Sequence, residues 1–156
     1  MDFEHAKLVL AALEEEKVRY VLIGGVALNL IGLPRATLDI DLFVEPEERN
    51  IERLKHALRR VFDDPMIEDI RSEDLLGEYP AVQYVPPTGT FSVDILTRLG
   101  DAFRYEDLES QRIPFEEIVV TVATPRTLYR MKKGTVRPRD WDDAISLRRR
   151  FGIEED

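Results

Sequence analysis

Two aspartates separated by one residue, Asp39 and Asp41, interrupt an apolar run in the first third of the chain. In a strand, residues i and i+2 share a face. Both carboxylates therefore point to one side, and Leu38, Ile40 and Leu42 point to the other, toward the core. Adjacent carboxylates repel each other and lose hydration on burial unless a cation lies between them. A purely structural role does not explain this pair of carboxylates, whereas binding of a divalent metal ion does.

A third aspartate, Asp94, interrupts another apolar segment, FSVDIL at 91–96. If this segment pairs with the strand carrying Asp39 and Asp41, the three carboxylates form one cluster. Hard oxygen donors without histidine or cysteine suit Mg²⁺ or Mn²⁺ rather than zinc. Two such ions can bracket the attacking and leaving oxygens of a phosphoryl displacement. The alternative for Asp94 alone is structural, either a salt bridge to Arg98 or a turn contact.

A glycine pair, Gly24-Gly25, stands between the apolar run YVLI and a short helical segment, upstream of the two aspartates. Glycine lets the backbone approach a ligand closely, and exposed amides at a helix start attract phosphate. By itself the pair would also suit any tight turn from strand to helix. Its place upstream of the Asp-Ile-Asp strand favours a phosphate site.

Together, these features resemble the polymerase-β-type nucleotidyltransferase superfamily, whose signature is a glycine-rich turn, an acidic pair and a third acid on a neighbouring strand. The form IGGVALNLIGLPRATLDIDL is most similar to minimal nucleotidyltransferases of the AbiEii type, found in toxin–antitoxin and phage-defence systems. It is also similar to small nucleotidyltransferase antitoxins that modify a partner toxin. The resemblance covers 20–44 and Asp94, and extends more weakly over 124–147.

The resemblance implies a magnesium- or manganese-dependent enzyme that moves a nucleoside monophosphate from a nucleoside triphosphate, such as ATP, to a hydroxyl group. The acceptor would be a protein side chain or an RNA end such as that of tRNA, and a toxin or antitoxin protein is the implied partner. The competing hypothesis is a non-catalytic nucleotide-binding or antitoxin module that acts by occluding its partner. The presence of all three acids argues against that module.

The resemblance also assigns roles to individual residues. The metal ions would be bound by Asp39 and Asp41, and Asp94 would complete the site and help to activate the acceptor hydroxyl. The glycine pair would hold the triphosphate, and one of two lysines would neutralise it. These binding residues are Gly24, Gly25 and either Lys132 or Lys133. Arg35 and Thr37, just before the acidic strand, would reach the nucleotide or acceptor, or else anchor the loop.

Composition and charge are those of a small cytoplasmic enzyme or binding domain. The 156 residues include no cysteine, which excludes disulfides, a thiol nucleophile and a cysteine-based zinc site. No run approaches the roughly 20 apolar residues of a membrane span. Although the net charge is −9, residues 124–151 hold nine basic and three acidic residues. That excess predicts a basic face able to meet phosphate, or else a solvated surface paired with acids elsewhere.

Apolar periodicity and breaking residues predict an α+β fold, with one mixed sheet that carries the acidic cluster and helices packed against it. We expect a single domain over 1–156, with a basic helical part over 124–151. Trp141, Ile145 and Phe151 are expected in the core, and Tyr129 on a packed helix face. The predicted helices cover 3–17, 25–32, a segment after Pro46, a segment from Pro125 and 139–151, and the predicted strands 19–23, 38–44, 81–85, 90–97 and 118–122.

Overall fold

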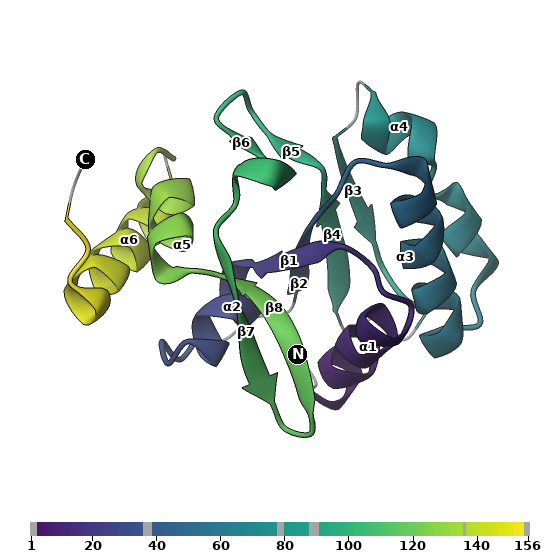
Figure 1. Ribbon diagram of the computed structural model, residues 1–156, viewed down its shortest axis with the longest axis horizontal. Helices are drawn as coiled ribbons and strands as arrows, with labels where there is room; N and C mark the ends of the chain where they lie inside the picture. Colours follow the sequence, from purple (N-terminus) through teal and green to yellow (C-terminus); the bar gives the residue numbers. More distant parts are fainter. Residues whose placement is uncertain (1–2, 36–38, 78–79, 88–90, 136, 155–156) are drawn as a thin grey trace.

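The computed structural model describes residues 3–35, 39–77, 80–87, 91–135 and 137–154 (Figure 1). Its helices are α1 (Phe3–Glu15), α2 (Gly24–Leu30), α3 (Glu48–Val61), α4 (Ser72–Leu76), α5 (Pro125–Lys133) and α6 (Pro138–Phe151), with 3₁₀ turns η1 (Pro65–Asp69) and η2 (Tyr105–Asp107). Its strands are β1 (Tyr20–Ile23), β2 (Asp39–Val44), β3 (Ala81–Tyr84), β4 (Ser92–Leu96), β5 (Arg98–Leu99), β6 (Phe103–Arg104), β7 (Ser110–Phe115) and β8 (Ile118–Ala123).

Six strands form one mixed sheet in the order β3-β4-β2-β1-β8-β7. Strand β2 runs antiparallel to β1 and parallel to β4, and β1 runs parallel to β8. Strands β5 and β6 form a separate two-stranded ribbon. The predicted combination of one mixed sheet with helices packed against it is confirmed. Strand β7 and the β5–β6 ribbon were not predicted.

The central strands β1 and β2 differ in their sequence patterns because they differ in burial. All four residues of β1 are buried, as expected for an inner strand covered on both faces. In β2, Ile40 and Leu42 are fully buried, whereas Asp39 and Asp41 are only partly buried. The alternation predicted from the sequence is therefore present from Asp39 to Leu42, after which Phe43 and Val44 are both buried. Leu38 lies outside the described residues.

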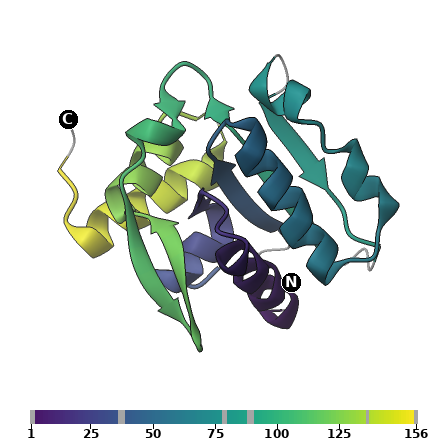
Figure 2. The same cartoon turned by 45° about the vertical axis from the view of Figure 1, so that its right-hand side comes forward.

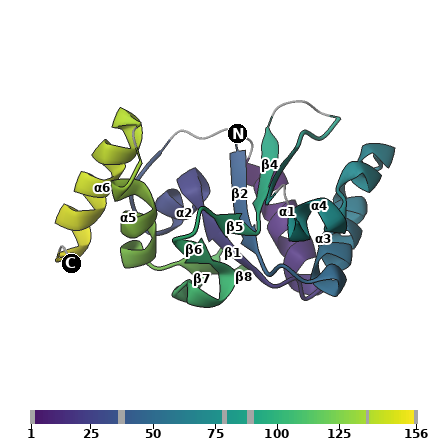
Figure 3. The same ribbon diagram turned by 90° about the horizontal axis from the view of Figure 1, so that it is seen from above.

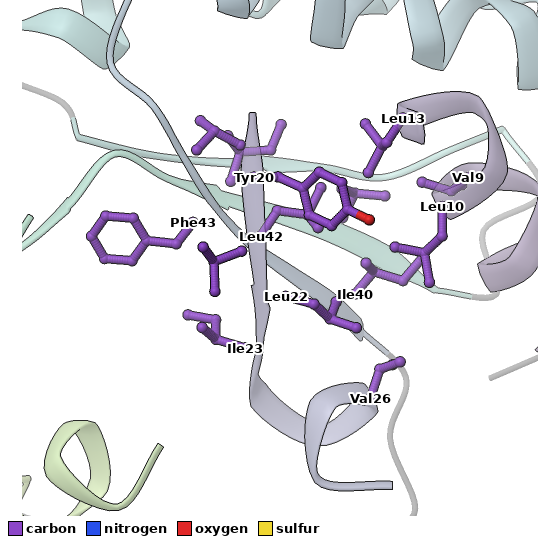
Figure 4. Close-up of a cluster of buried hydrophobic side chains, with 14 of the residues drawn as sticks. Val9, Leu10, Leu13, Tyr20, Leu22, Ile23, Val26, Ile40, Leu42 and Phe43 are labelled. Atoms are coloured by element: carbon purple, nitrogen blue, oxygen red, sulfur yellow. The ribbon is translucent and has the colours of Figure 1, made fainter. Parts of the chain in front are cut away.

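The core lies between this sheet and helices α1 and α3, which pack side by side (Figures 1 and 2). Side chains of α1 are directed at those of β1 and β2 (Figure 4). Leu10, Leu13, Leu22 and Ile40 belong to this cluster and are essentially inaccessible to solvent. Their burial holds β2, and with it the two aspartates, in a fixed place on the sheet.

Helices α5 and α6 pack against each other at the end of the molecule opposite α3 (Figures 1 and 3). Helix α5 begins as predicted, with Pro125 in its first turn and Thr124 as its N-cap, whose Oγ1 accepts a hydrogen bond from the Thr127 amide at 3.2 Å. Helix α6 ends at Phe151 and is followed by its C-cap Gly152, which adopts the left-handed conformation with φ of 62°. Nowhere in the described ranges is a helix both long and apolar enough to cross a membrane.

Three residues predicted to be core are exposed instead. Trp141 and Ile145 are each 49% exposed, and Phe151 is 38% exposed. The side of α6 that packs inward carries Asp140, Ala144 and Leu147, because this helix packs against α5, where Lys132 pairs with Asp140. The prediction that Tyr129 is a packed residue is confirmed.

Candidate active site

The three aspartates meet on two neighbouring parallel strands. Strand β2 pairs with β4 in a register that aligns Asp39 with Ser92 and Asp41 with Asp94. The Ser92 hydroxyl donates a hydrogen bond of 2.6 Å to Asp39 Oδ1 and lies 3.5 Å from Asp94 Oδ1. Gln83, on β3, donates a weak bond of 3.4 Å to the same hydroxyl. The register therefore places all three carboxylates on one side of the sheet.

Burial and neighbouring negative charge raise the pKa values of both Asp41 and Asp94. They stand opposite each other in the register of β2 and β4, so their carboxyl groups are close neighbours. Burial, together with the charges of Asp94 and Asp39, raises the pKa of Asp41 to about 7. Burial also raises the pKa of Asp94, against hydrogen bonds from Asp41, Gln83 and Ser92 that lower it. The cluster holds more negative charge than its surroundings neutralise.

Gly24 closes the other side of the acidic cluster. It adopts φ of 73°, a conformation that favours glycine. A Cβ at this position would overlap the Asp41 carboxylate and lie 2.7 Å from its carboxyl carbon. Only a residue without a side chain allows the start of α2 to approach β2 this closely. Gly24 therefore has a steric role at the acidic cluster. From the sequence alone, this glycine could equally have belonged to an ordinary turn.

The loop after α2 is held by Asn29. Its side-chain amide donates to the Arg35 carbonyl oxygen at 2.7 Å, and its Oδ1 accepts from the Arg35 amide at 2.7 Å. The Arg35 guanidinium forms an ion pair with Asp143 on α6. The Arg35 backbone is thus fixed by Asn29, while its guanidinium reaches α6.

Charged residues of α5, α6 and their connection form a compact network opposite the aspartates. Lys132 Nζ lies 3.1 Å from Asp140 Oδ1 and 2.8 Å from Asp143 Oδ2. The second contact is an ion pair without hydrogen-bond alignment, so Asp143 Oδ2 is buried without a hydrogen-bond partner. Asp140 also accepts hydrogen bonds of 2.8 Å from Arg137 and from Thr135. Burial would raise the pKa of Asp140, but these bonds together lower it to about 2.

These groups surround one cleft of about 350 Å³. Seven of the nine predicted site residues line it: Gly24, Gly25, Arg35, Asp39, Asp41, Asp94 and Lys132. Lys133 is exposed and lies outside this lining, with its Nζ 5.5 Å from the centre of the Tyr129 ring. Thr37 lies outside the described residues. Segments as far apart in sequence as 24 and 132 thus meet at one cleft.

Sequence reasoning missed several residues of this cleft. Thr135 and Arg137 add a polar and a basic group from the segment between α5 and α6, and their nearness to basic Lys132 was the available signal. Leu96 and Leu99 give the cleft an apolar part. Leu99 belongs to the unpredicted β5–β6 ribbon, and a two-residue strand leaves no periodic signal.

The donor chemistry of the cluster fits a hard divalent cation, since it offers carboxylate oxygens that carry an uncompensated charge. As arranged here, no three acidic, histidine or cysteine side chains in the described part of the chain converge closely enough to hold an ion. Binding would require the three carboxylates to converge further than they do here, with Asp41 ionised. The two histidines contribute nothing to the cleft lining.

Comparisons with known proteins address the same region. The family model described as "Nucleotidyl transferase AbiEii toxin, Type IV TA system" matches residues 8–147. A search of curated proteins finds no match. A candidate nucleotidyltransferase of known structure from Thermotoga maritima aligns with a TM-score of 0.56 and 16% identity, covering 96% of this chain and 92% of its own.

An antigenic nucleotidyltransferase-like protein from Paracoccidioides brasiliensis aligns with a TM-score of 0.54 and 19% identity, covering 92% of this chain and 74% of its own. At such identities the likeness concerns the fold alone. It confirms the predicted nucleotidyltransferase-like fold.

Proposed function

Since the chain belongs to the AbiEii nucleotidyl transferase family, we propose that it transfers a nucleoside monophosphate from a nucleoside triphosphate to a hydroxyl group of a protein or an RNA. The hydroxyl oxygen forms a bond to the α-phosphorus, the bond from that phosphorus to the bridging oxygen breaks, and pyrophosphate leaves. The observation that carries this proposal is the convergence of Asp39, Asp41, Asp94, two glycines and Lys132 on one cleft.

The acidic side of the cleft would act on the reacting atoms. Asp39, Asp41 and Asp94 would hold Mg²⁺ or Mn²⁺, which supplies positive charge to the transferring phosphoryl group when bound. Asp94 would accept the proton of the acceptor hydroxyl. Its pKa is raised by burial, and a raised pKa suits a carboxylate that must take up a proton near neutral pH.

The opposite side of the cleft would bind the triphosphate. Gly24 and Gly25 expose backbone without side chains, so phosphate oxygens could approach the amides closely. Lys132 pairs with two acids of α6, Asp140 and Asp143, and its charge also lowers the pKa of Asp41. Arg35 would add a second cation from the loop after α2. Such a reaction would take place in the cytoplasm, with an antitoxin or toxin protein as the regulatory partner.

Thermal melting with ATP, CTP, GTP and UTP, each with magnesium or with EDTA, tests the binding step. A triphosphate at 100 times its dissociation constant should stabilise the fold by about 2.7 kcal/mol, and only with magnesium. The Asp41→Asn variant serves as the control in which metal-dependent stabilisation is lost. If no triphosphate raises the melting temperature of the parent in this way, the nucleotide proposal is wrong.

Labelled triphosphates test the transfer step. Incubation with total tRNA or with a lysate of the host should place label from the α-phosphate on the acceptor, and release label from the γ-phosphate in pyrophosphate. Transfer of γ-label alone would identify a kinase. Magnesium-dependent binding without transfer of either label would support the non-catalytic module instead.

A further inference from the structure

Ser92 carries a buried hydroxyl beside the acidic cluster, and none of the proposed reaction steps uses it. The residue is 5% exposed. The register of β2 and β4 sets it opposite Asp39, and alternation along β4 places it on the same side of the strand as Asp94. A buried hydroxyl needs a hydrogen-bond partner, so the partner that Ser92 takes indicates what the residue does.

The hydroxyl has a single proton, and the distances show which acceptor receives it. Asp39 Oδ1 lies 2.6 Å from Ser92 Oγ, a length typical of a strong bond to a charged acceptor. Asp94 Oδ1 lies 3.5 Å from the same oxygen, at the limit of a hydrogen bond. Gln83, which stands opposite Asp94 on the edge strand β3, donates to Ser92 Oγ at 3.4 Å. Ser92 therefore accepts from Gln83 and donates its proton to Asp39.

The bond from Ser92 acts against repulsion within the acidic cluster. Carboxylates must be ionised to bind a metal ion, and the three aspartates occupy neighbouring positions on two paired strands, where like charges repel. Repulsion alone would turn the Asp39 side chain away from Asp41 and Asp94, toward water. The hydroxyl of Ser92 instead holds the Asp39 carboxylate on the side of β4.

We propose that Ser92 is a positioning residue of the metal site, whose hydroxyl holds Asp39 in the orientation in which its carboxylate binds a divalent cation. A carboxylate has about four lone-pair sites on its two oxygens, so donation to Oδ1 leaves acceptor capacity for a metal ion. Hydrogen-bond partners of metal ligands typically contribute about 10–100-fold to metal affinity. This role rests on the proposed nucleotidyltransferase function, which assigns Asp39 to the metal.

Thr97, directly after β4, provides a matched structural hydroxyl. It is 4% exposed, about as buried as Ser92. Its Oγ1 donates a hydrogen bond to the backbone carbonyl oxygen of Leu75 at 2.6 Å, the same length as the bond from Ser92 to Asp39. The two hydroxyl groups thus match in burial and in bond length and differ in their acceptors, so a role in metal binding is expected of Ser92 alone of the two.

Binding of Mn²⁺ to the nucleotide-free protein, measured by electron paramagnetic resonance, tests this role without turnover. Ser92→Ala should raise the dissociation constant for Mn²⁺ about tenfold, because Asp39 loses its donor. Ser92→Thr keeps the hydroxyl and should bind Mn²⁺ as the parent does. Thr97→Val should also keep the affinity of the parent, although it loses a buried hydrogen bond. Urea unfolding in EDTA checks that each variant is folded during the titration, and if Ser92→Thr is not, the comparison of Ser92→Ala with Thr97→Val decides.

Equal Mn²⁺ affinity of Ser92→Ala and the parent would overturn the proposal, and so would an equal loss in Thr97→Val, which would reduce the effect to packing. Tighter binding by Ser92→Ala would also overturn it, because Ser92 would then compete with the metal ion for Asp39.

The transfer assay with labelled triphosphates separates this inference from the proposed function. Weakened Mn²⁺ binding in Ser92→Ala, found for a parent that transfers no nucleotide, would support the role of Ser92 while contradicting the enzymatic proposal. Transfer by the parent together with unchanged Mn²⁺ affinity in Ser92→Ala would contradict the role of Ser92 alone. A parent that binds no Mn²⁺ would contradict both.

Discussion

Gly24 and Asp41 are packed so closely that no side chain can exist at position 24 while the Asp41 carboxylate keeps its place. Contact at this point joins the strand-to-helix turn to the acidic strand. The glycine is therefore required by the folded site before any ligand is considered.

Replacement of Gly24 by alanine should both destabilise the protein and weaken triphosphate binding. The left-handed backbone and the overlap with Asp41 together should cost about 3 kcal/mol of unfolding free energy. Gly152→Ala is the matched control, because Gly152 has φ of 62° but open space around it, and should cost only about 1 kcal/mol. Urea unfolding of both variants measures the difference. Equal losses would show that the overlap with Asp41 is relieved without cost.

The raised pKa of Asp41 predicts how stability depends on pH in the absence of metal. Its pKa rises from 3.8 to about 7 on folding, so the folded protein keeps a proton that the unfolded chain has released. The free energy of unfolding should therefore fall as the pH rises from about 4 through 7. In Asp41→Asn this part of the dependence should vanish, leaving the variant as stable as the parent or more so at pH 8.

Urea unfolding in EDTA at pH 5 and pH 8 checks this expectation. Asp101→Asn, in an exposed turn, is the control that should keep the dependence of the parent. A large loss of metal-free stability in Asp41→Asn at pH 8 would instead identify the acidic pair as a structural element.

The central part of the site was predictable because its signals are local. Asp39 and Asp41 are placed by alternation within one strand, and the Gly24 turn lies close by in sequence. To predict the position of Asp94 required only that its own strand pair with β2. Each of these inferences needed only the pattern within a short segment and the pairing of one strand with another. Sequence periodicity is informative over segments of this length.

The other parts of the fold and of the site depend on contacts between residues far apart in sequence, which no local sequence pattern predicts. Arg35 and Asp143 form their ion pair across 108 residues. Strand β7 has an edge position and contains Pro114, which reads as a break in a strand. On α6, the apolar residues were assigned to the core by type, but the helix turns Asp140 inward because Lys132 and Arg137 meet it there. Trp141 lies on the exposed side of the same helix.

The lowered pKa of Asp140 predicts that the protein loses stability in acid. Burial would raise its pKa, yet hydrogen bonds from Arg137, Thr135 and Lys132 lower it from 3.8 to about 2. The folded protein therefore releases this proton more readily than the unfolded chain, and the resulting stability is present above pH 4 and is lost as the pH falls through about 2. Asp140→Asn should lose about 2 kcal/mol at pH 7.

Urea unfolding at pH 7 and at pH 2 measures this difference, which should shrink at the lower pH. The control is Asp142→Asn, an exposed residue of the same helix, which should stay within about 0.5 kcal/mol of the parent. Equal effects of the two substitutions would mean that the hydrogen bonds to Asp140 contribute no net stability.

Adjacent lysines on α5 allow the proposed phosphate contact to be tested with a neighbouring control. Lys132 lines the cleft between Asp140 and Asp143, whereas Lys133 is exposed beside Tyr129. Lys132→Met should weaken magnesium-dependent triphosphate binding about tenfold, the equivalent of one charged hydrogen bond. It should also lower stability by up to about 3 kcal/mol, because the buried Asp140 and the partly buried Asp143 lose a shared cation.

Lys133→Met should leave both quantities unchanged, because its ammonium group is solvated and outside the cleft lining. Calorimetric titration with each triphosphate, carried out well below the melting temperature of the weaker variant, separates binding from unfolding. If Lys133→Met weakened binding as much as Lys132→Met, the triphosphate would have to lie along the outer side of α5. The cleft between the aspartates and Lys132 would then be the wrong place for it.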